Sequence, residues 1–349
     1  MTPPATTPHV ITLGTAGGPK IWTKGQQRPR CGIATAVVVG ERWYLVDAGH
    51  GAFTQIKRAG LSVENLAGIF ITHLHSDHVI DLNSVAVLGM FDLVRELPRI
   101  PIYGPGDRGV LPPVSPRAAV PPSPVFPQDP TPGMSSLFRS LMHAHATDLN
   151  DRVLDALRPS PCDVFEARDI ELPADIGYHP NDSPSPEMDP FVVHEDDEVR
   201  VTATLVVHPP IAPAFAFRFQ TSQGSVTISG DTRPSENLIR LARDTDLLLH
   251  EAIDFQWVAS VYSGDDELSR ASADHHRKSH TSPEDAGRIA AAAGARQLAL
   301  HHLVPGNSPE RAWREAERSF GRQVHIPKDL ETIAFGAVSS HTAPAVQSV

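Results

Sequence analysis

The sequence has little cysteine, no long apolar run and no excess of positive charge. Only two cysteines occur among its 349 residues, so a framework of several disulfides is excluded, while one bridge between Cys31 and Cys162 stays open. No apolar run reaches the ~18 residues that a membrane-spanning helix needs. The N-terminus has no basic stretch followed by an apolar one, so we expect no signal peptide, a cytoplasmic location and no membrane partner.

The formal net charge of −11 disfavours binding to nucleic-acid backbones. The acidic excess lies in residues 105–198, which hold 17 acidic and 6 basic side chains and no lysine. Ten prolines between Pro105 and Pro132 predict an irregular stretch with polyproline character, and an approximate apolar stripe predicts a helix over 135–157. We interpret 105–198 as an inserted subdomain or lid, with a disordered, solvated linker as the alternative.

Histidine is abundant, with 18 copies, and apolar residues make up 40% of the chain, enough for a large core. On both sides of the insertion, short β-like runs alternate with helical ones, so we expect one α/β domain over residues 8–336 and a loose tail at 337–349. The expected strands are 10–13, 35–39, 43–46, 68–72, 199–207, 214–219, 225–229, 246–250, 297–301 and 331–335. The expected helices are 52–59, 79–89, 235–243, 282–293 and 308–320.

Three imidazoles and a carboxylate follow the expected strand 68–72 within six residues: His73, His75, Asp77 and His78. Side chains this dense converge on one point only where the chain turns, and a loop can direct two pairs of them at two adjacent ions. Neutral imidazole and carboxylate suit zinc, and also iron or manganese. The alternative is a solvated polar loop between strand and helix.

Further polar side chains end the expected strands of the second half. Asp231 follows a strand and a glycine, and its carboxylate is suited to bridge two ions, although a helix cap or turn is the alternative. His208, His250 and the pair His301–His302 close other strands. Each histidine alone is more often structural, but strand ends on one rim of a sheet can meet at one site.

Taken in order, these residues resemble the metallo-β-lactamase superfamily, and within it the ribonuclease Z and arylsulfatase-like branch. The likeness covers residues 8–104 and 199–336 and leaves out the acidic middle. The segments that carry it are Leu13–Pro19, Val46–Gly49, Phe70–His75, Gly230–Thr232, His250–Ala252 and Ser279–Ser282.

The resemblance implies an α/β fold, an αββα sandwich with a Pro-rich acidic insertion, with two divalent metal ions on one rim. Zinc is the first expectation, with manganese or iron as alternatives. His302 is preferred to His301 because the family places its ligand last in that pair. Asp77 is also expected to be catalytic, and His280 and Glu251 are candidates for proton donors or for side chains that support the ligands. The implied ligands are His73, His75 and His208 for one ion, Asp77, His78 and His302 for the other, and Asp231 between them.

The leading hypothesis is a hydrolase that uses a metal-bridging hydroxide on a small molecule: an aryl ester, lactone, sulfate, phosphodiester or activated aryl ether. Nucleic acid is disfavoured because the acidic insertion lies where ribonuclease Z enzymes carry a basic arm. The glycine-rich turn that follows the metal motif in the family is replaced here by Val79–Asn83. The threonine that precedes the family's last ligand is replaced by His301. The alternative is a transfer RNA 3′-processing endonuclease, with a basic surface at Lys20, Lys24, Arg28 and Arg30. A non-enzymatic subunit with a redundant metal site is a third hypothesis, and self-association stays open.

Overall fold

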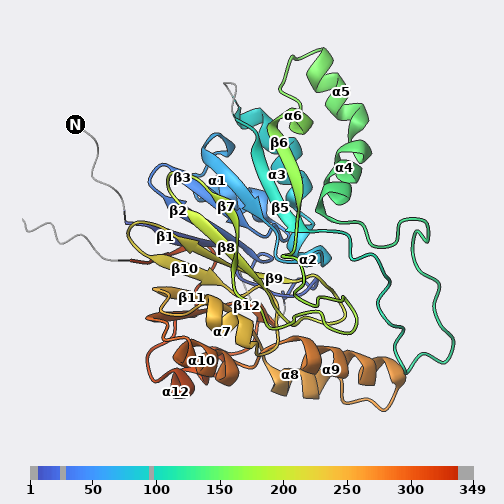
Figure 1. The fold of residues 1–349 in the computed structure, drawn as a ribbon, viewed down its shortest axis with the longest axis vertical. Helices are drawn as coiled ribbons and strands as arrows, with labels where there is room; N and C mark the ends of the chain where they lie inside the picture. The colour runs from blue at the N-terminus through green and yellow to red at the C-terminus, as the bar shows by residue number, and fades with distance from the viewer. Residues whose placement is uncertain (1–6, 24–28, 94–97, 337–349) are drawn as a thin grey trace, which may run out of the picture.

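The computed structural model describes residues 7–23, 29–93 and 98–336 (Figure 1). The predicted tail at 337–349 and two of the four predicted basic residues, Lys24 and Arg28, lie outside the described residues. Two mixed β-sheets lie face to face, and helices cover both outer faces (Figure 1). No helix in the described ranges is long and apolar enough to cross a lipid bilayer.

The first sheet has seven strands in the order β13-β1-β2-β3-β4-β5-β6, and β3 to β6 run parallel to one another. The second sheet has six strands in the order β12-β11-β10-β9-β8-β7, with β10 to β12 parallel. The strands of the first sheet are β1 (His9–Gly14), β2 (Ala34–Val39), β3 (Arg42–Val46), β4 (Leu66–Phe70), β5 (Ile100–Pro105), β6 (Phe165–Ile170) and β13 (Glu331–Ala334). Those of the second are β7 (Phe191–Glu195), β8 (Arg200–Leu205), β9 (Phe215–Gln220), β10 (Ser225–Ile228), β11 (Leu247–Ile253) and β12 (Gln297–Val304).

The helices fall into two outer layers and a peripheral group. Against the first sheet pack α1 (Ala52–Arg58), α3 (Leu82–Gly89) and α4 (Met134–Ala144). Against the second pack α7 (Glu236–Leu241), α10 (Pro283–Ala292) and α12 (Ala316–Phe320). The others are α2 (Ser76–Val79), α5 (Ala146–Leu154), α6 (Pro161–Val164), α8 (Phe255–Val261), α9 (Glu267–Ser279) and α11 (Glu310–Trp313), with 3-10 turns at Val63–Asn65 and Met90–Asp92.

Strand periodicity divides the core into layers. In β11, Leu247 and Leu249 pack between the sheets, while Leu248 packs under the outer helices, because successive side chains point to opposite faces. Phe70 of β4 lies in the inner layer, with ring centroids 5.1 Å from Phe219 and 5.2 Å from Tyr103. This layering is the αββα sandwich, and the predicted fold class is confirmed.

The middle of the chain differs from the sequence pattern in its details. The helix expected over 135–157 is two helices, α4 and α5, separated at His145. Strand β6 pairs with β5 over six residues and β7 pairs with β8, so two segments of this zone extend the core sheets. Neither strand was predicted, and β5, α8 and α9 were also missed. The role of 105–198 as an inserted subdomain or lid stays a prediction.

The proline-rich stretch from 106 to 133 contains no helix or strand, and it extends from β5 to α9 and returns to α4 (Figure 1). Arg117 Nη2 lies 2.7 Å from Asp274 Oδ2 of α9. Nearer to β5, Arg108 Nη1 donates to the carbonyl oxygen of Pro210 at 2.5 Å. The stretch is therefore held near Arg108, where Asn181 Nδ2 also donates to the carbonyl oxygen of Leu111 at 3.1 Å, and at Arg117, whose contact is exposed to solvent.

We expect Arg117→Ala to speed thermolysin cleavage between 110 and 126 while leaving the melting temperature nearly unchanged. An exposed ion pair contributes only ~0–1 kcal/mol to stability, but this pair fixes the outer end of the loop. The matched control is Arg152→Ala, which removes an exposed pair with Asp148 on α5. Equal cleavage rates in wild type and Arg117→Ala would show that the pair does not hold the loop.

Candidate metal centre

The histidine-rich segment turns directly after β4. His73 and His75 lie in the loop, and His75 has the extended backbone of a residue that precedes a helix (φ −67°, ψ 147°). Asp77 and His78 lie in the one-turn helix α2 and are buried. A strand end, a tight loop and a helical turn thus bring four polar side chains of one short segment to one rim of the sandwich.

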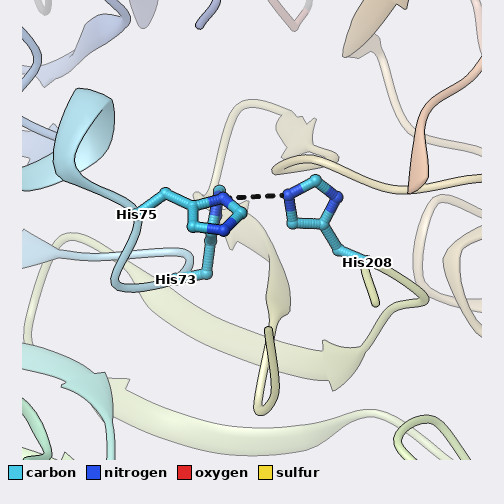
Figure 2. A group of neighbouring side chains, drawn as sticks. All are labelled: His73, His75 and His208. Carbon is cyan, nitrogen blue, oxygen red and sulfur yellow. Dashed lines mark hydrogen bonds between the residues drawn. The ribbon is translucent and has the colours of Figure 1, made fainter. Parts of the chain in front are cut away.

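A first group of ring nitrogens comes from His73, His75 and His208 (Figure 2). His75 Nδ1 lies 3.0 Å from His73 Nε2 and 3.1 Å from His208 Nε2. Tetrahedral zinc with nitrogens at 2.0–2.1 Å separates two ligand atoms by about 3.3 Å. The Nδ1 of His208 donates to the carbonyl oxygen of Ser279 at 2.8 Å, so its Nε2 carries the lone pair that faces the group.

A second group consists of Asp77, His78 and His302. His302 Nε2 lies 3.2 Å from His78 Nε2 and 3.4 Å from Asp77 Oδ2. His78 Nε2 lies 3.6 Å from the same carboxylate oxygen. These spacings again suit three atoms around one cation.

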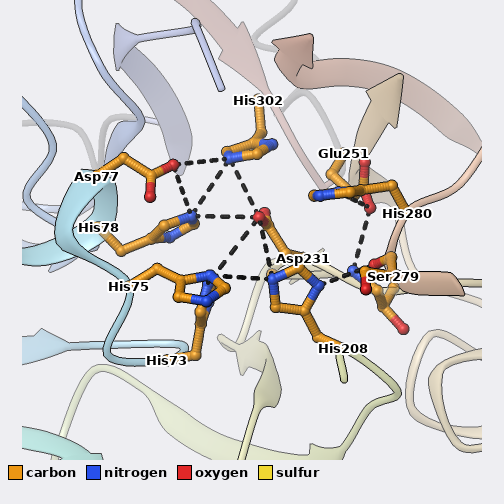
Figure 3. Close-up of polar contacts among 12 residues, drawn as sticks. His73, His75, Asp77, His78, His208, Asp231, Glu251, Ser279, His280 and His302 are labelled. Carbon is orange, nitrogen blue, oxygen red and sulfur yellow. Dashed lines mark hydrogen bonds and ion pairs between the residues drawn. The ribbon is translucent and has the colours of Figure 1, made fainter. Parts of the chain in front are cut away.

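Asp231 lies between the two groups (Figure 3). Its Oδ2 is 3.2 Å from His302 Nε2 and 3.4 Å from His78 Nε2 on one side. On the other side, it is 3.7 Å from His208 Nε2 and 3.9 Å from His73 Nε2. Its second oxygen, Oδ1, is buried and has no hydrogen-bond partner in the described structure.

The turn that directs Asp231 requires the glycine before it. Gly230 has a φ of +58°, and a Cβ there would lie 2.5 Å from the carbonyl oxygen of Phe215. A side chain at this position would therefore displace the neighbouring backbone. Steric crowding by the neighbouring backbone thus explains why the motif has glycine at position 230.

The position of His302 depends on a β-bulge in β12. His301 pairs with Glu251 and Leu303 pairs with Ala252, so His302 is the extra residue, and its φ is +47°. A bulge bends the strand and re-aims its side chains, which directs His302 toward the rim (Figure 3). Its neighbour His301 is buried, and burial lowers the pKa of His301 to about 3.

The N-terminal glycine motif lies against the same histidine. A Cβ on Gly17 would lie 2.4 Å from His302 Nδ1, so only glycine allows the loop to approach this ring. The backbone N–H of Gly18 lies 3.4 Å from His302 Nε2. The N-terminal glycine motif therefore packs against the metal centre at His302, which lies in β12.

Asp47, which was not among the predicted site residues, holds the histidine segment in place. Its Oδ2 lies 2.8 Å from His78 Nδ1, and its Oδ1 accepts from the backbone N–H of Thr72 at 2.8 Å. A carboxylate on the far nitrogen of a histidine fixes the ring and leaves Nε2 to bind a metal. In the sequence, Asp47 stood out only as part of the Val46–Gly49 resemblance. An aspartate that ends a buried strand is by itself an indication of a functional site.

Glu251 and His280 form a buried pair beside these groups (Figure 3). His280 Nδ1 lies 3.1 Å from Glu251 Oε1, which also accepts from the backbone N–H groups of Thr232 and Thr281. Burial raises the pKa of Glu251. Burial alone would lower the pKa of His280, but the Glu251 carboxylate outweighs it, and the pKa is raised. The pair is therefore suited to hold a proton.

The charges and the donor atoms fit two divalent cations. Burial holds the pKa of His73 and His208 well below the usual histidine value, which keeps these rings neutral with a free lone pair. Asp47, Asp77 and Asp231 are buried, and no lysine or arginine within the described ranges forms an ion pair with them. Buried carboxylates need cationic partners, and metal ions in such a donor set would provide them.

The remaining predicted positions lie outside this cluster. The Nδ1 of His250 lies 2.8 Å from the carbonyl oxygen of Glu251 in the buried strand β11, and burial lowers the pKa of His250 to about 4. Arg30 is turned inward, where its Nη1 donates to Thr15 Oγ1 at 2.5 Å and to the carbonyl oxygen of Pro327 at 2.6 Å. Lys20 is exposed over the ring of Trp22.

Comparisons with known proteins show which proteins this chain resembles. A family model described as the metallo-beta-lactamase superfamily matches residues 29–150. A ribonuclease Z from Mycolicibacterium gilvum (strain PYR-GCK) is 27% identical over 311 residues, which is 87% of this chain and 90% of the relative. A ribonuclease Z from Mycolicibacterium paratuberculosis is 28% identical over 316 residues, which is 89% of this chain and 94% of the relative.

These relatives correct the expected substrate. We predicted a small-molecule substrate and disfavoured nucleic acid, and a relationship to proteins named Ribonuclease Z over most of the chain overturns that prediction. The charge argument failed because it used a sum over 105–198. Screening limits exposed charges to about 8–10 Å at moderate salt, so a summed charge does not give the field at the site.

Solved structures share the fold at lower identity. Human tRNase Z, short form, has a TM-score of 0.59 and 20% identity, with 94% of this chain and 100% of that chain covered. The metallo-beta-lactamase fold protein YhfI from Bacillus subtilis has a TM-score of 0.58 and 18% identity, with 94% and 99% covered. Together with the two-sheet architecture, these findings show that the chain has the metallo-β-lactamase fold, matches the superfamily's model over residues 29–150 and is a metal-dependent hydrolase.

Proposed function

We propose that this protein is a ribonuclease Z-type endonuclease that cleaves precursor transfer RNA at its 3′ side, in the cytoplasm. The observation that carries the proposal is the relationship to ribonuclease Z proteins over 87% of the chain, joined to a rim where Asp231 lies between two groups of three side chains. Phosphodiester hydrolysis is among the reactions that such a dinuclear arrangement suits.

Seven side chains would hold two divalent cations, with zinc as the proposed metal. The imidazoles of His73, His75 and His208 suit zinc because all three donors are nitrogen. The second group adds a carboxylate to two imidazoles, and Asp231 would contact both cations. The full proposed set is His73, His75, Asp77, His78, His208, Asp231 and His302.

When bound, the two cations would supply a strong nucleophile from water near neutral pH and stabilise the charge on the phosphate. The chain itself supplies the proton. With Nδ1 of His280 held by Glu251, Nε2 is the ring nitrogen that can donate to the leaving ribose oxygen as its bond to phosphorus breaks. Glu251 fixes this orientation through its contact with Nδ1 and offsets the positive charge on the ring.

Two cavities beside the centre suit a nucleic-acid strand. One of about 350 Å³ is lined by His75, Leu74 and prolines such as Pro213, and it offers an apolar wall next to the first group. The other, about 900 Å³, is lined by Lys20, Trp22, Trp257 and further residues. The indole N–H of Trp22 donates to the carbonyl oxygen of Gly17, which links this larger cleft to the loop against His302.

The larger cleft combines aromatic rings with positive charge. The rings of Trp22 and Trp257 meet edge to face at 5.3 Å, and Lys20 Nζ lies 5.2 Å from the centre of the Trp22 ring. Arg311 adds a second exposed cation to the lining. Trp22 is buried, so the ring on which a base could stack is that of the partly exposed Trp257, with phosphates near the two cations. Stacking of this kind contributes ~1–3 kcal/mol per base.

Metal content tests the ligand assignment. We expect close to two transition-metal ions per chain in protein purified without chelator or added zinc, measured by elemental analysis. Asp231→Ala should bind both ions at least ~10-fold more weakly, because it removes the group that would contact both. Asp189→Ala, at an exposed position, is the control. Fewer than one ion per chain after zinc or manganese is supplied would rule out a dinuclear centre.

Cleavage of a transfer RNA precursor tests the reaction. The metal-loaded wild type should release the 3′ trailer at low salt, and Asp77→Ala and Asp231→Ala should lose nearly all of this activity while keeping their circular dichroism spectra. The physical reason is that each substitution removes a proposed metal contact, on which the nucleophile depends. An intact precursor after long incubation with metal-loaded wild type would reject the proposed substrate.

Proton donation is tested separately from metal binding. His280→Ala should lower the single-turnover rate by ~10²–10⁴-fold, the usual contribution of a general acid, with the metal content still near two. Glu251→Gln should lower the rate less, because the ring stays in place but loses its carboxylate partner. A normal rate in His280→Ala would assign the proton to another group.

A further inference from the structure

Helix α9 ends in a second cluster of histidines, outside the seven proposed ligands. One ring nitrogen from each of His275, His276 and His280 lies within 4.8 Å of the other two. His276 and His280 are four residues apart, so the end of the helix places them on one face. Three converging imidazoles form the donor set of a transition-metal site.

His276 has a buried nitrogen that needs a partner. Its Nδ1 is shielded from solvent and has no hydrogen-bond partner in the described structure. Two aromatic rings border it, Tyr262 at 5.4 Å and Trp257 at 6.1 Å between centroids. A buried polar atom without a partner is destabilising, so a cation bound here would remove that cost.

His280 is shared between this cluster and the catalytic rim. One of its nitrogens lies within 4.8 Å of donor atoms of His208 and Asp231, and one within 4.8 Å of donor atoms of His275 and His276. Its Nδ1 faces Glu251 at 3.1 Å, which leaves Nε2 for either purpose. That nitrogen cannot donate a proton to a leaving group while its lone pair binds a cation.

We propose that His275, His276 and His280 form a third zinc site whose occupation inhibits the enzyme by engaging the proton donor. The site itself follows from the histidine cluster, and the inhibition rests on the proposed function of His280. Imidazole ligands favour zinc over magnesium, which prefers oxygen and keeps its waters. The cluster has no carboxylate ligand, whereas both groups of the main centre contact one, so it should fill last.

Zinc stoichiometry tests the site without any substrate. Protein that holds two zinc ions is titrated with zinc against a chromogenic chelator, and we expect one further equivalent in wild type. His276→Gln and His275→Gln, which each remove one ligand but keep a polar side chain, should lose that equivalent or bind it at least tenfold more weakly. His143→Gln, on the exposed side of α4, is the matched control.

Activity tests the consequence. Excess zinc should inhibit cleavage of the transfer RNA precursor by wild type at the concentrations that fill the third site, and a weak chelator should reverse the inhibition. Magnesium should not inhibit. His276→Gln should cleave at the wild-type rate and resist zinc at least tenfold better, because its His280 remains free.

The outcomes separate the proposals. An equal third equivalent in wild type and both glutamine variants would overturn the site. A third equivalent that the variants lose, without inhibition of wild type, would overturn the inhibitory role. If wild type cleaves no precursor at all, the proposed function fails, while the stoichiometry still decides the site.

Discussion

A buried carboxylate must have cations around it, and that constraint organises this molecule. Asp231 lies inside the rim with four imidazole nitrogens within 4 Å of its Oδ2, and no lysine or arginine among the described residues pairs with it. Those imidazoles come from both sheets, after β4 and β8 and from α2 and β12. The two sheets must therefore end at the same rim, and the αββα packing of their inner faces achieves this.

A second set of contacts fixes the rim from behind. Thr72 donates its backbone N–H and its hydroxyl to the Asp47 carboxylate, and its carbonyl oxygen accepts from the backbone N–H of Phe215 at 2.9 Å. The first sheet is thereby joined to the second one residue before His73. Asp47 also orients His78, so one aspartate links the strand end, the cross-sheet contact and a proposed ligand. Loss of its carboxylate would disturb all three together.

Much of this was predictable from local patterns. Apart from β5, the strands on both sides of the insertion were predicted from their short apolar runs, and six residues from His73 to His78 indicated the site. Strands β6 and β7 were missed because proline and acidic residues surround them, and β6 also because its partner β5 is remote in sequence. The bulge that directs His302 depends on pairing with β11, which no local pattern contains. The predicted substrate was wrong because the charges of residues 105–198 were summed without regard to where they lie relative to the site.

The prolines of the stretch that contacts α9 have a consequence for how that contact breaks and re-forms. Proline fixes φ near −65°, so a chain with ten prolines between Pro105 and Pro132 has few conformations to gain when its Arg117 contact breaks. The stretch also stays joined to β5 and α4 at its two ends, where Thr131 Oγ1 donates to Asp107 Oδ1 at 2.7 Å. Little entropy is therefore gained when the loop leaves α9, and little is lost when it returns. A weak exposed ion pair is enough to hold such a loop, because it has little disorder to oppose.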